Sequence, residues 1–412
     1  MNVSSFIARR IAFNQQKSFS RFIIRLSITA TVISVAVMIV TLSFVNGFEE
    51  TVSGKVFSFM GHVRIQYRQP QKSSLAEEVP IEEDTAMVAA IKKMNNVRTV
   101  HPFATKNAIL KTTDEIEGVL LKGLDTTYDF KILSSFLQPG GRWINYNDST
   151  YSREIVISVY TAKQLQLKLN DRVLIYFIRP DGSLRPDKLT IVGLYKTGIE
   201  EYDKNFAIGD IKLIRKLNDW QPHEIGGYEV FLKDFKGMDA VSSAIYNSDH
   251  FSEQWETKTV KELAPNIFDW LYIIGNNGNV LIVIMVVIAA INFITCLIIL
   301  VLERVRMIGL LKAVGASDWT VQRIFLYHSA LITFSGILIG TAAALGLLWL
   351  QQKTGFIHLD EEAYYMSSAA VAINWWQVAA VGAGTLLLAL LVLLIPSFLV
   401  KKIQPIKAIR FN

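Results

Sequence analysis

Four stretches of the chain are apolar enough and long enough to cross a lipid bilayer, and they constrain its fold more than any other feature. They cover residues 26–45, 280–302, 324–350 and 378–400. A helix needs about 20 apolar residues to span the hydrocarbon core. Core helices of soluble proteins are usually shorter and amphipathic, whereas these stretches are apolar on all sides. The sequence therefore predicts an α-helical membrane protein with four transmembrane helices.

The distribution of charge predicts which segments face the cytoplasm. Residues 1–25, 303–323 and 401–412 together hold 13 lysines and arginines against 2 acidic residues. The segments 46–275 and 351–377 carry net charges of −3 and −2. Because an excess of basic residues marks cytoplasmic loops, both termini and the loop 303–323 are predicted to be cytoplasmic. The net charge of +6 then reflects topology, and no nucleic-acid partner is predicted.

The segment 46–275 is predicted to form a large mixed α+β domain outside the membrane. Apolar alternation predicts strands at 62–67, 155–157, 173–178, 190–195 and 228–232, and helical spacing predicts helices at 83–96, 161–169 and 210–220. The pattern indicates two lobes. The single cysteine, Cys296, lies in the second span, so this domain must be stable without disulfides.

A segment rich in proline, glycine and charge, residues 179–187, lies between two of these strands. Such a composition predicts a protruding hairpin loop. It leaves open whether the loop is an ordinary surface hairpin or a functional protrusion. The loop between the third and fourth spans, residues 351–377, is predicted on the same side of the membrane.

Motifs for catalysis are missing from the sequence. A nucleotide-binding Walker loop needs Gly-x4-Gly-Lys-[Ser/Thr]. The only Gly-Lys pair is Gly54-Lys55, which Val56 follows, and Glu49 stands where the first glycine belongs. The six histidines and one cysteine lack metal-ligand spacing. The chain is therefore predicted to be neither an enzyme nor a metal or cofactor binder.

Few ionisable residues lie within the spans. Arg25 is at the cytoplasmic edge, and His328 is near the start of the third span. A proton-coupled transporter needs ionisable groups along its path, so that class is disfavoured.

The segment after the second span is the most informative motif. Residues 302–317 predict a short amphipathic helix in the cytoplasm, with Ile308, Leu311 and Val314 on one apolar edge and Gly315 at its end. Two interpretations fit this pattern. The helix lies on the lipid headgroups, or it docks into a separate ATPase as a coupling helix.

Four groups of residues resemble a known family. Glu303-Arg304-x-Arg306-x-Ile308-Gly309-x-Leu311-Lys312-Ala313-x-Gly315-Ala316 resembles the segment after the second span in FtsX-like/MacB-type ABC permeases. Asn46-Gly47-Phe48-Glu49 and Ala290-Ile291-Asn292-Phe293-Ile294 resemble segments of the LolC/LolE permeases of the lipoprotein-releasing ABC transporter. The ending Pro396-Ser397, with 404–410, is similar as well. Met307 departs from many relatives, which carry an acidic residue there.

The resemblance implies a MacB/FtsX-like membrane fold with a MacB-like periplasmic core. It implies a permease subunit in the inner membrane of a Gram-negative bacterium, working with membrane lipid, a second permease subunit, a cytoplasmic ABC ATPase dimer and a periplasmic lipoprotein carrier. ATP and magnesium would bind the ATPase, and lipoproteins would be the cargo.

The resemblance also implies roles for named residues. Coupling to the ATPase is expected from Glu303, Arg304, Arg306, Ile308, Gly309, Leu311, Lys312 and Gly315. A path for lipid is expected to begin near Phe44, Val45 and Phe48. In the family, a hook-shaped loop of one permease contacts the periplasmic carrier, and the loop 179–187 occupies its place but is shorter. Contact with the carrier is expected from Arg179, Pro180, Asp181, Gly182, Leu184, Arg185 and Pro186.

Two other functions remain open from sequence. A MacB-type exporter of peptides or small molecules is the nearer one, although such proteins often carry a fused N-terminal ATPase. An FtsX-like regulator of a cell-wall hydrolase is the other, although its outer domain is generally smaller than the ~230 residues predicted here.

Overall fold

The chain forms two compact units in a computed structural model, which describes residues 18–68, 78–146, 150–178 and 183–397. We call the first the membrane unit; it comprises residues up to 50 together with 270–358 and the chain from 368 onward. We call the second the sheet domain; it comprises residues 51–269 and 359–367.

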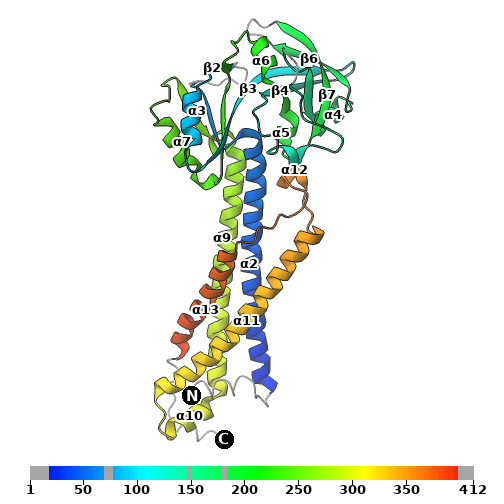
Figure 1. Cartoon of the computed structure of the whole chain (residues 1–412). Helices are drawn as coiled ribbons and strands as arrows, with labels where there is room; N and C mark the ends of the chain where they lie inside the picture. The colour runs from blue at the N-terminus through cyan, green and yellow to red at the C-terminus, as the bar shows by residue number, and fades with distance from the viewer. Residues whose placement is uncertain (1–17, 69–77, 147–149, 179–182, 398–412) are drawn as a thin grey trace. The chain divides into compact units, whose positions relative to one another are not determined.

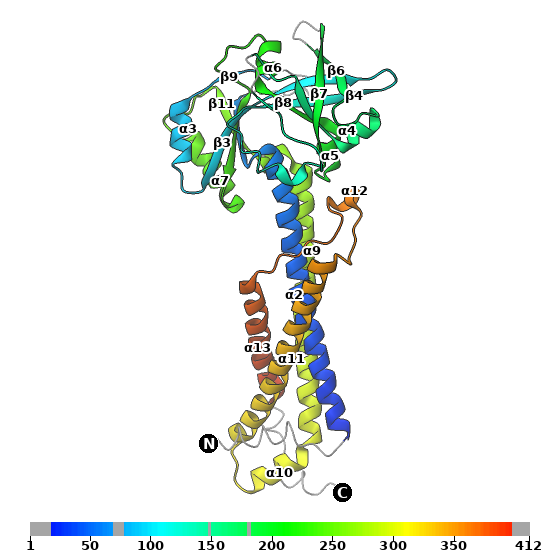
Figure 2. The same ribbon diagram turned by 45° about the vertical axis from the view of Figure 1, so that its right-hand side comes forward.

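Within the described residues, the membrane unit is built from four long helices, which confirms the predicted number of transmembrane helices. Each contains a window apolar and long enough to cross a bilayer. Both views show α2 and α9 running side by side (Figures 1 and 2). The four helices are α2 (Ser18–Met60), α9 (Pro265–Glu303), α11 (Asp318–Thr354) and α13 (Trp375–Ser397).

Two of these helices extend well past the apolar spans. At about 1.5 Å per residue, the 43 residues of α2 reach roughly 64 Å, about twice the hydrocarbon thickness. The predicted boundary at residue 45 marks where hydropathy falls, but the helix continues to Met60. It does so because Val52, Val56 and Phe59 are buried in the core of the sheet domain. Likewise, α9 begins fifteen residues before the predicted span, at Pro265.

Glycines set the spacing between α2 and α11. A Cβ added to Gly336 would lie 2.8 Å from Cβ of Thr31, and one added to Gly340 would lie 2.8 Å from the carbonyl oxygen of Val32. Small residues allow such close backbone approach between helices in lipid. The small-residue pattern of the third span is therefore used for packing against the first.

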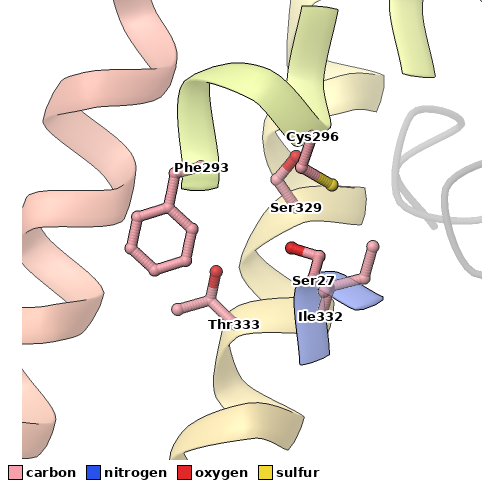
Figure 3. Close-up of a pocket in the computed structure, with 6 residues that line it drawn as sticks. All are labelled: Ser27, Phe293, Cys296, Ser329, Ile332 and Thr333. Carbon is pink, nitrogen blue, oxygen red and sulfur yellow. The ribbon is translucent and has the colours of Figure 1, made fainter. Parts of the chain in front are cut away.

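Uncharged polar groups meet where α2, α9 and α11 pack together, near the start of α2 and the end of α9. Figure 3 shows Ser27 of α2 near Cys296 of α9 and Ser329 and Thr333 of α11, around a pocket of about 10 Å³. That is about the space of one water molecule. The carbonyl of Ser27 accepts a hydrogen bond from the Thr31 hydroxyl at 2.9 Å. That bond lies within α2, but the Asn292 amide of α9 also donates to the Ser27 carbonyl, at 3.4 Å. Polar contacts of this second kind join transmembrane helices.

Two short helices complete the connections of the long ones. Helix α10 (Val305–Ala313) follows α9, and α12 (Glu361–Tyr364) lies between α11 and α13 in the sequence.

The sheet domain is a mixed α+β structure, as predicted. Its strands are β1 (Val63–Tyr67), β2 (Ile81–Glu82), β3 (Val97–Lys111), β4 (Ile116–Leu124), β5 (Glu154–Ser158), β6 (Arg172–Ile178), β7 (Leu184–Tyr195), β8 (Phe206–Asp210), β9 (Glu224–Ile225), β10 (Gly227–Leu232) and β11 (Trp255–Thr259). Its helices are α3 (Thr85–Lys92), α4 (Val159–Gln164), α5 (Glu200–Asn205), α6 (Ile211–Leu217), α7 (Met238–Tyr246) and α8 (Val260–Leu263), with 3-10 turns at Ser134–Phe136 and Phe235–Gly237.

One long strand, β3, joins two lobes of this domain. Nine strands follow the order β11-β1-β10-β3-β4-β8-β5-β7-β6, and β6 also pairs with β3. Six strands from β3 to β6 therefore close into a ring, while β11, β1 and β10 extend the sheet from the first half of β3. Residues 97–103 pair with β10, and residues 104–111 pair with β4.

The sequence pattern had not predicted β3 or β4. In β3 the polar residues His101 and Lys106 are buried, and Pro102 interrupts the apolar alternation. A period-two pattern is visible only when one face is apolar and the other polar. In contrast, the predicted strands at 155–157, 173–178 and 228–232 lie within β5, β6 and β10.

Candidate functional site

Helix α10 is anchored to the membrane unit by its inner side. Ile308 is fully buried in a cluster that includes Val301 of α9 and Phe325 of α11, and Leu311 packs against the same cluster. Gly309 is also buried. Arg304 has a non-helical backbone at the start of α10, so a break after Glu303 turns the chain from α9 into α10.

The outer side of α10 carries a different apolar pair. Leu310 is 61% exposed and Val314 is 84% exposed, and these residues are four apart, so they share a helix face. Arg306 is exposed on the same face. The predicted edge of Ile308, Leu311 and Val314 is therefore wrong as a single surface, because packing turns Ile308 and Leu311 inward and leaves Val314 outside.

The end of α10 is held to the next helix. Lys312 forms an ion pair with Asp318 in the first turn of α11, at 2.8 Å. Gly315 has a left-handed backbone, with φ +96°, and no atom lies within 4 Å of where its Cβ would be. A glycine meets this backbone requirement without strain. These contacts hold the outer face of α10 in one orientation relative to the bundle.

The predicted lipid-path residues lie where α2 packs against its neighbours. A Cβ added to Gly278 of α9 would lie 2.7 Å from Val45. The Phe48 ring meets the Trp270 ring edge-on, with centroids 6.2 Å apart. Phe44 packs against an apolar cluster of the bundle. Val45 and Phe48 therefore lie where α2 packs against α9, and Phe44 lies where α2 packs against the rest of the bundle.

An apolar cavity of about 430 Å³ lies among α2, α9 and α13. From α2 it is lined by Met38 and Leu42, and from α13 by Gly384 and other small or aliphatic residues. The predicted path residues Phe44, Val45 and Phe48 do not line it. The small residues of the fourth span were visible in the sequence, but the cavity needs three helices to form.

The Asn-Gly-Phe-Glu segment packs against the chain before α13. The Asn46 amide donates to the Gln377 side chain at 2.6 Å. A Cβ added to Gly47 would lie 2.3 Å from the carbonyl oxygen of Ala370. This motif therefore keeps α2 in close contact with the segment that leads into α13.

The predicted carrier loop is shorter than 179–187. Leu184, Arg185 and Pro186 belong to strand β7 and pair with Ile178, Phe177 and Tyr176. They belong to the strand because the antiparallel pairing of β7 with β6 extends as far as Leu184 and Ile178. The other predicted contact residues, Arg179, Pro180, Asp181 and Gly182, lie outside the described part of the chain.

The end of α2 is held in the sheet domain by a buried group of charges. Glu229 of β10 forms ion pairs at 2.8 Å with Lys122 of β4 and with Arg64 of β1. Lys122 also donates to the carbonyl oxygen of Phe59, and Arg64 to that of Met60 at 3.3 Å. Cations at a helix C-terminus satisfy its free carbonyls.

Burial lowers the pKa of Lys122 to about 8, although Glu229 opposes the shift. This cluster was not predictable from sequence patterns, because its members come from three separate strands.

A neutral histidine lies beside the same helix end. The Nδ1 atom of His62 accepts a hydrogen bond from the backbone N–H of Leu232 at 3.2 Å, and its ring stacks on Phe57 at 4.2 Å. Burial lowers the pKa of His62 to about 4. Within the described residues, no group of three or more His, Cys, Asp or Glu side chains is arranged to hold a metal ion.

Comparisons with known proteins cover nearly the whole chain. Residues 26–247 match the MacB-like periplasmic core domain, and residues 279–405 match the FtsX-like permease C-terminal region. The chain is 22% identical to the lipoprotein-releasing system transmembrane protein LolC of Neisseria meningitidis serogroup B and 23% identical to LolE of Haemophilus influenzae. Each alignment covers 98% of both chains.

Among solved structures, the periplasmic region of MacB from Actinobacillus actinomycetemcomitans is similar to part of the chain. The match has 12% identity and a TM-score of 0.35, and it covers 52% of this chain and 96% of that one.

Proposed function

Because the chain belongs to the MacB-like periplasmic core domain family and continues into an FtsX-like permease region, we propose that it is the permease subunit of an ABC transporter that releases lipoproteins from the inner membrane. The observation that carries the proposal is end-to-end similarity to relatives named as lipoprotein-releasing permeases. The chain itself is non-catalytic in this proposal, and ATP and magnesium bind a separate ATPase.

The proposed placement puts the termini and α10 in the cytoplasm and the sheet domain in the periplasm. The excess of lysine and arginine in the terminal segments and the 303–323 loop supports this orientation. The partners would be an ATPase dimer, a second permease subunit and a periplasmic carrier that accepts the lipoprotein.

The physical problem of release explains why such parts are needed. Burial of an acyl chain is worth about 0.8 kcal/mol per methylene, so one ~16-carbon chain is held by roughly 12 kcal/mol and three by more than ~30 kcal/mol. Since about 1.4 kcal/mol is a factor of ten, unaided release into water is negligible. The chains need an apolar route, an energy source and a protein acceptor.

The outer face of α10 is suited to receive the ATPase. Leu310 and Val314 expose an apolar surface beside Arg306, and apolar centres with polar rims are typical of protein interfaces. The inner side of α10 is buried against α9 and α11, so a push on the outer face would be transmitted to these helices.

The acyl chains would leave the bilayer along α2 and α9. Val45 and Phe48 lie at the contact of these helices, and the apolar cavity among α2, α9 and α13 is nearby in the same unit. An apolar surface along the route lowers the cost of moving a chain out of the hydrocarbon.

Depletion of the protein in its native host tests the function. We expect outer-membrane lipoproteins to accumulate in the inner membrane, measured by separating the two membranes on a density gradient. Normal sorting after depletion would exclude this function.

A pair of adjacent leucines tests the docking face. Leu310→Asp changes an exposed side chain and should leave protein abundance unchanged while lipoprotein sorting fails. Leu311→Asp places a carboxylate against the buried cluster and should lower protein abundance. Normal sorting by Leu310→Asp at normal abundance would remove ATPase docking from this face.

A matched pair of glycines tests the cavity. Gly384 lines the cavity and Gly346 does not, and for both no atom lies within 4 Å of the position of a Cβ. Gly384→Leu should slow lipoprotein release, whereas Gly346→Leu should not. Equal release rates in the two variants would show that the cavity is not on the route.

A further inference from the structure

Nine residues from the membrane-unit part of the sequence belong to the sheet domain. Residues 359–367, between α11 and α13, cluster with residues 51–269. They include α12 and carry Asp360 and Glu361. The sequence suggested a periplasmic loop over 351–377 and gave no reason to separate its middle from its ends.

Glu361 is seated against two lysines and a glycine of the sheet domain. Its Oε2 atom lies 2.5 Å from Nζ of Lys196. A Cβ added to Gly198 would lie 2.6 Å from Oε1 of Glu361 and 3.0 Å from Nζ of Lys55. Lys55 in turn donates to the carbonyl oxygen of Tyr365 at 2.7 Å. Contacts therefore come from α2, from the turn after β7, from the first residue of α12 and from Tyr365 directly after α12.

Hydrogen bonds to Asp203 hold the turn beside Glu361 in place. The buried Asp203 carboxylate accepts hydrogen bonds from the Thr197 N–H at 2.9 Å, from the Thr197 hydroxyl at 2.8 Å and from the Gly198 N–H at 3.0 Å. Gly198 has φ +74°, which favours glycine. The site for the carboxylate is thus shaped by the domain's own hydrogen bonds, and a preformed site lowers the entropic cost of holding the side chain.

We propose that Glu361 is a positioning residue for transport: its carboxylate, paired with Lys196 beside the turn at Gly198, clamps the α11–α13 connection to the sheet domain, together with the bond from Lys55 to Tyr365. Through the clamp, movements of α11 and α13 are transmitted to the sheet domain by a connection other than α2 and α9. Lys196 and Glu361 are partly exposed, and exposed ion pairs are weak, so the clamp can open and close within a transport cycle. This inference rests on the proposed function for its transport measurement only.

A zero-length cross-linker tests the clamp without any transport measurement. A water-soluble carbodiimide adds to a carboxylate and forms an O-acylisourea. A lysine amine within ion-pair distance then attacks the acyl carbon, which forms an amide and releases the carbodiimide as a urea. In native membranes we expect a cross-linked peptide, identified by mass spectrometry, that joins Glu361 to Lys196. Absence of this product in the wild-type protein would overturn the proposal.

Charge reversal tests the role of the clamp in transport. Glu361→Lys places a third cation beside the two lysines, so we expect loss of the cross-link and several-fold more outer-membrane lipoprotein retained in the inner membrane. The exchange variant Glu361→Lys with Lys196→Glu restores an ion pair and should recover both signals. Lys196→Arg keeps the charge but not the amine, so it should keep sorting and lose the Lys196 product.

Two glycines separate backbone strain from loss of the clamp. Gly198 and Gly140 both have left-handed backbones, with φ +74° and +85°, but the nearest atom to a Cβ at Gly140 is 4.0 Å away. Gly198→Ala should therefore displace the Glu361 carboxylate and reduce lipoprotein sorting. Gly140→Ala introduces the same backbone strain without displacing Glu361, so lipoprotein sorting should stay normal. Equal sorting defects in both variants, or wild-type sorting by Glu361→Lys, would overturn the positioning role.

The two proposals fail in distinguishable ways. If wild-type membranes release no lipoprotein, the proposed function is wrong, and the cross-link still decides whether Glu361 holds residues 359–367 to the sheet domain.

Discussion

The membrane unit and the sheet domain solve the same packing problem in two different solvents. Between α2 and α11, glycines bring backbones together, with positions for Cβ atoms as close as 2.8 Å to the facing helix. In the sheet domain, large side chains such as Phe59, Tyr195 and Tyr202 fill the core. In water, burial of apolar surface drives packing. In lipid that driving force between helices is lost, so close contact has to supply the attraction.

The polar groups buried in the two units differ in the same way. The sheet domain buries Lys122 and Glu229 as charged partners, whereas the described part of the bundle gathers the uncharged Ser27, Ser329 and Thr333. An ionised side chain is very costly in the bilayer centre. The comparison shows that charged side chains are buried where neighbouring strands can surround them with partners. Where lipid surrounds the helices, uncharged hydroxyl groups are buried instead.

The largest expected effect is loss of the buried carboxylate. Glu229→Gln leaves Lys122 and Arg64 buried without a counter-charge, and such changes cost about 3–5 kcal/mol. Denaturant unfolding of the purified protein, followed by tryptophan fluorescence, measures the loss. Glu154→Gln is the control, since Glu154 pairs with the exposed Arg142 and exposed pairs contribute less than about 1 kcal/mol. Similar losses in both variants would contradict the distinction between buried and exposed charge.

Acid should weaken the sheet domain through His62. Its pKa is about 4 in the folded state and 6.5 when unfolded. Between these values the unfolded state binds more protons, so stability falls as the pH decreases from about 6.5 to 4. A shift of this size corresponds to about 3 kcal/mol. Full stability should be present above pH 6.5, measured by denaturant unfolding across this range.

The control for this pH dependence is His62→Asn, which retains an oxygen that can accept from the Leu232 N–H but does not titrate. Its stability should fall less steeply over the same range. Burial also lowers the pKa of His101, which contributes with the same sign and remains in both proteins. Identical slopes would show that His62 does not stay neutral in the fold.

A smaller effect is expected from crowding the helix contact. Gly340→Leu forces α2 and α11 apart because its Cβ would meet the Val32 backbone, and overpacking costs about 1–3 kcal/mol. Thermal unfolding in detergent measures it. Gly346→Leu, with open space at that position, should unfold near the wild-type temperature. The reverse order of stabilities would show that Gly340 does not set this spacing.

Local patterns predicted elements well and faces poorly. Helix α10 was predicted within 302–317 and forms over Val305–Ala313. Its outward side was not predictable, because both Leu310 and Leu311 are apolar and the choice depends on where α9 and α11 lie. For the same reason the loop of the hairpin was predicted to be longer than it is: prolines and charges at 184–187 suggested a loop, but pairing with β6 continues through these residues.

The sequence by itself determined the four spans, the asymmetry of charge between the segments that flank them and the family to which the chain belongs. These follow from the cost of polar groups in lipid and from short motifs, both of which are local properties. Only the tertiary structure decided which face of α10 is exposed, how Lys122, Arg64 and Glu229 meet, and that residues 359–367 belong to the sheet domain. Each of these depends on contacts between segments far apart in the chain, which hydropathy and periodicity do not encode.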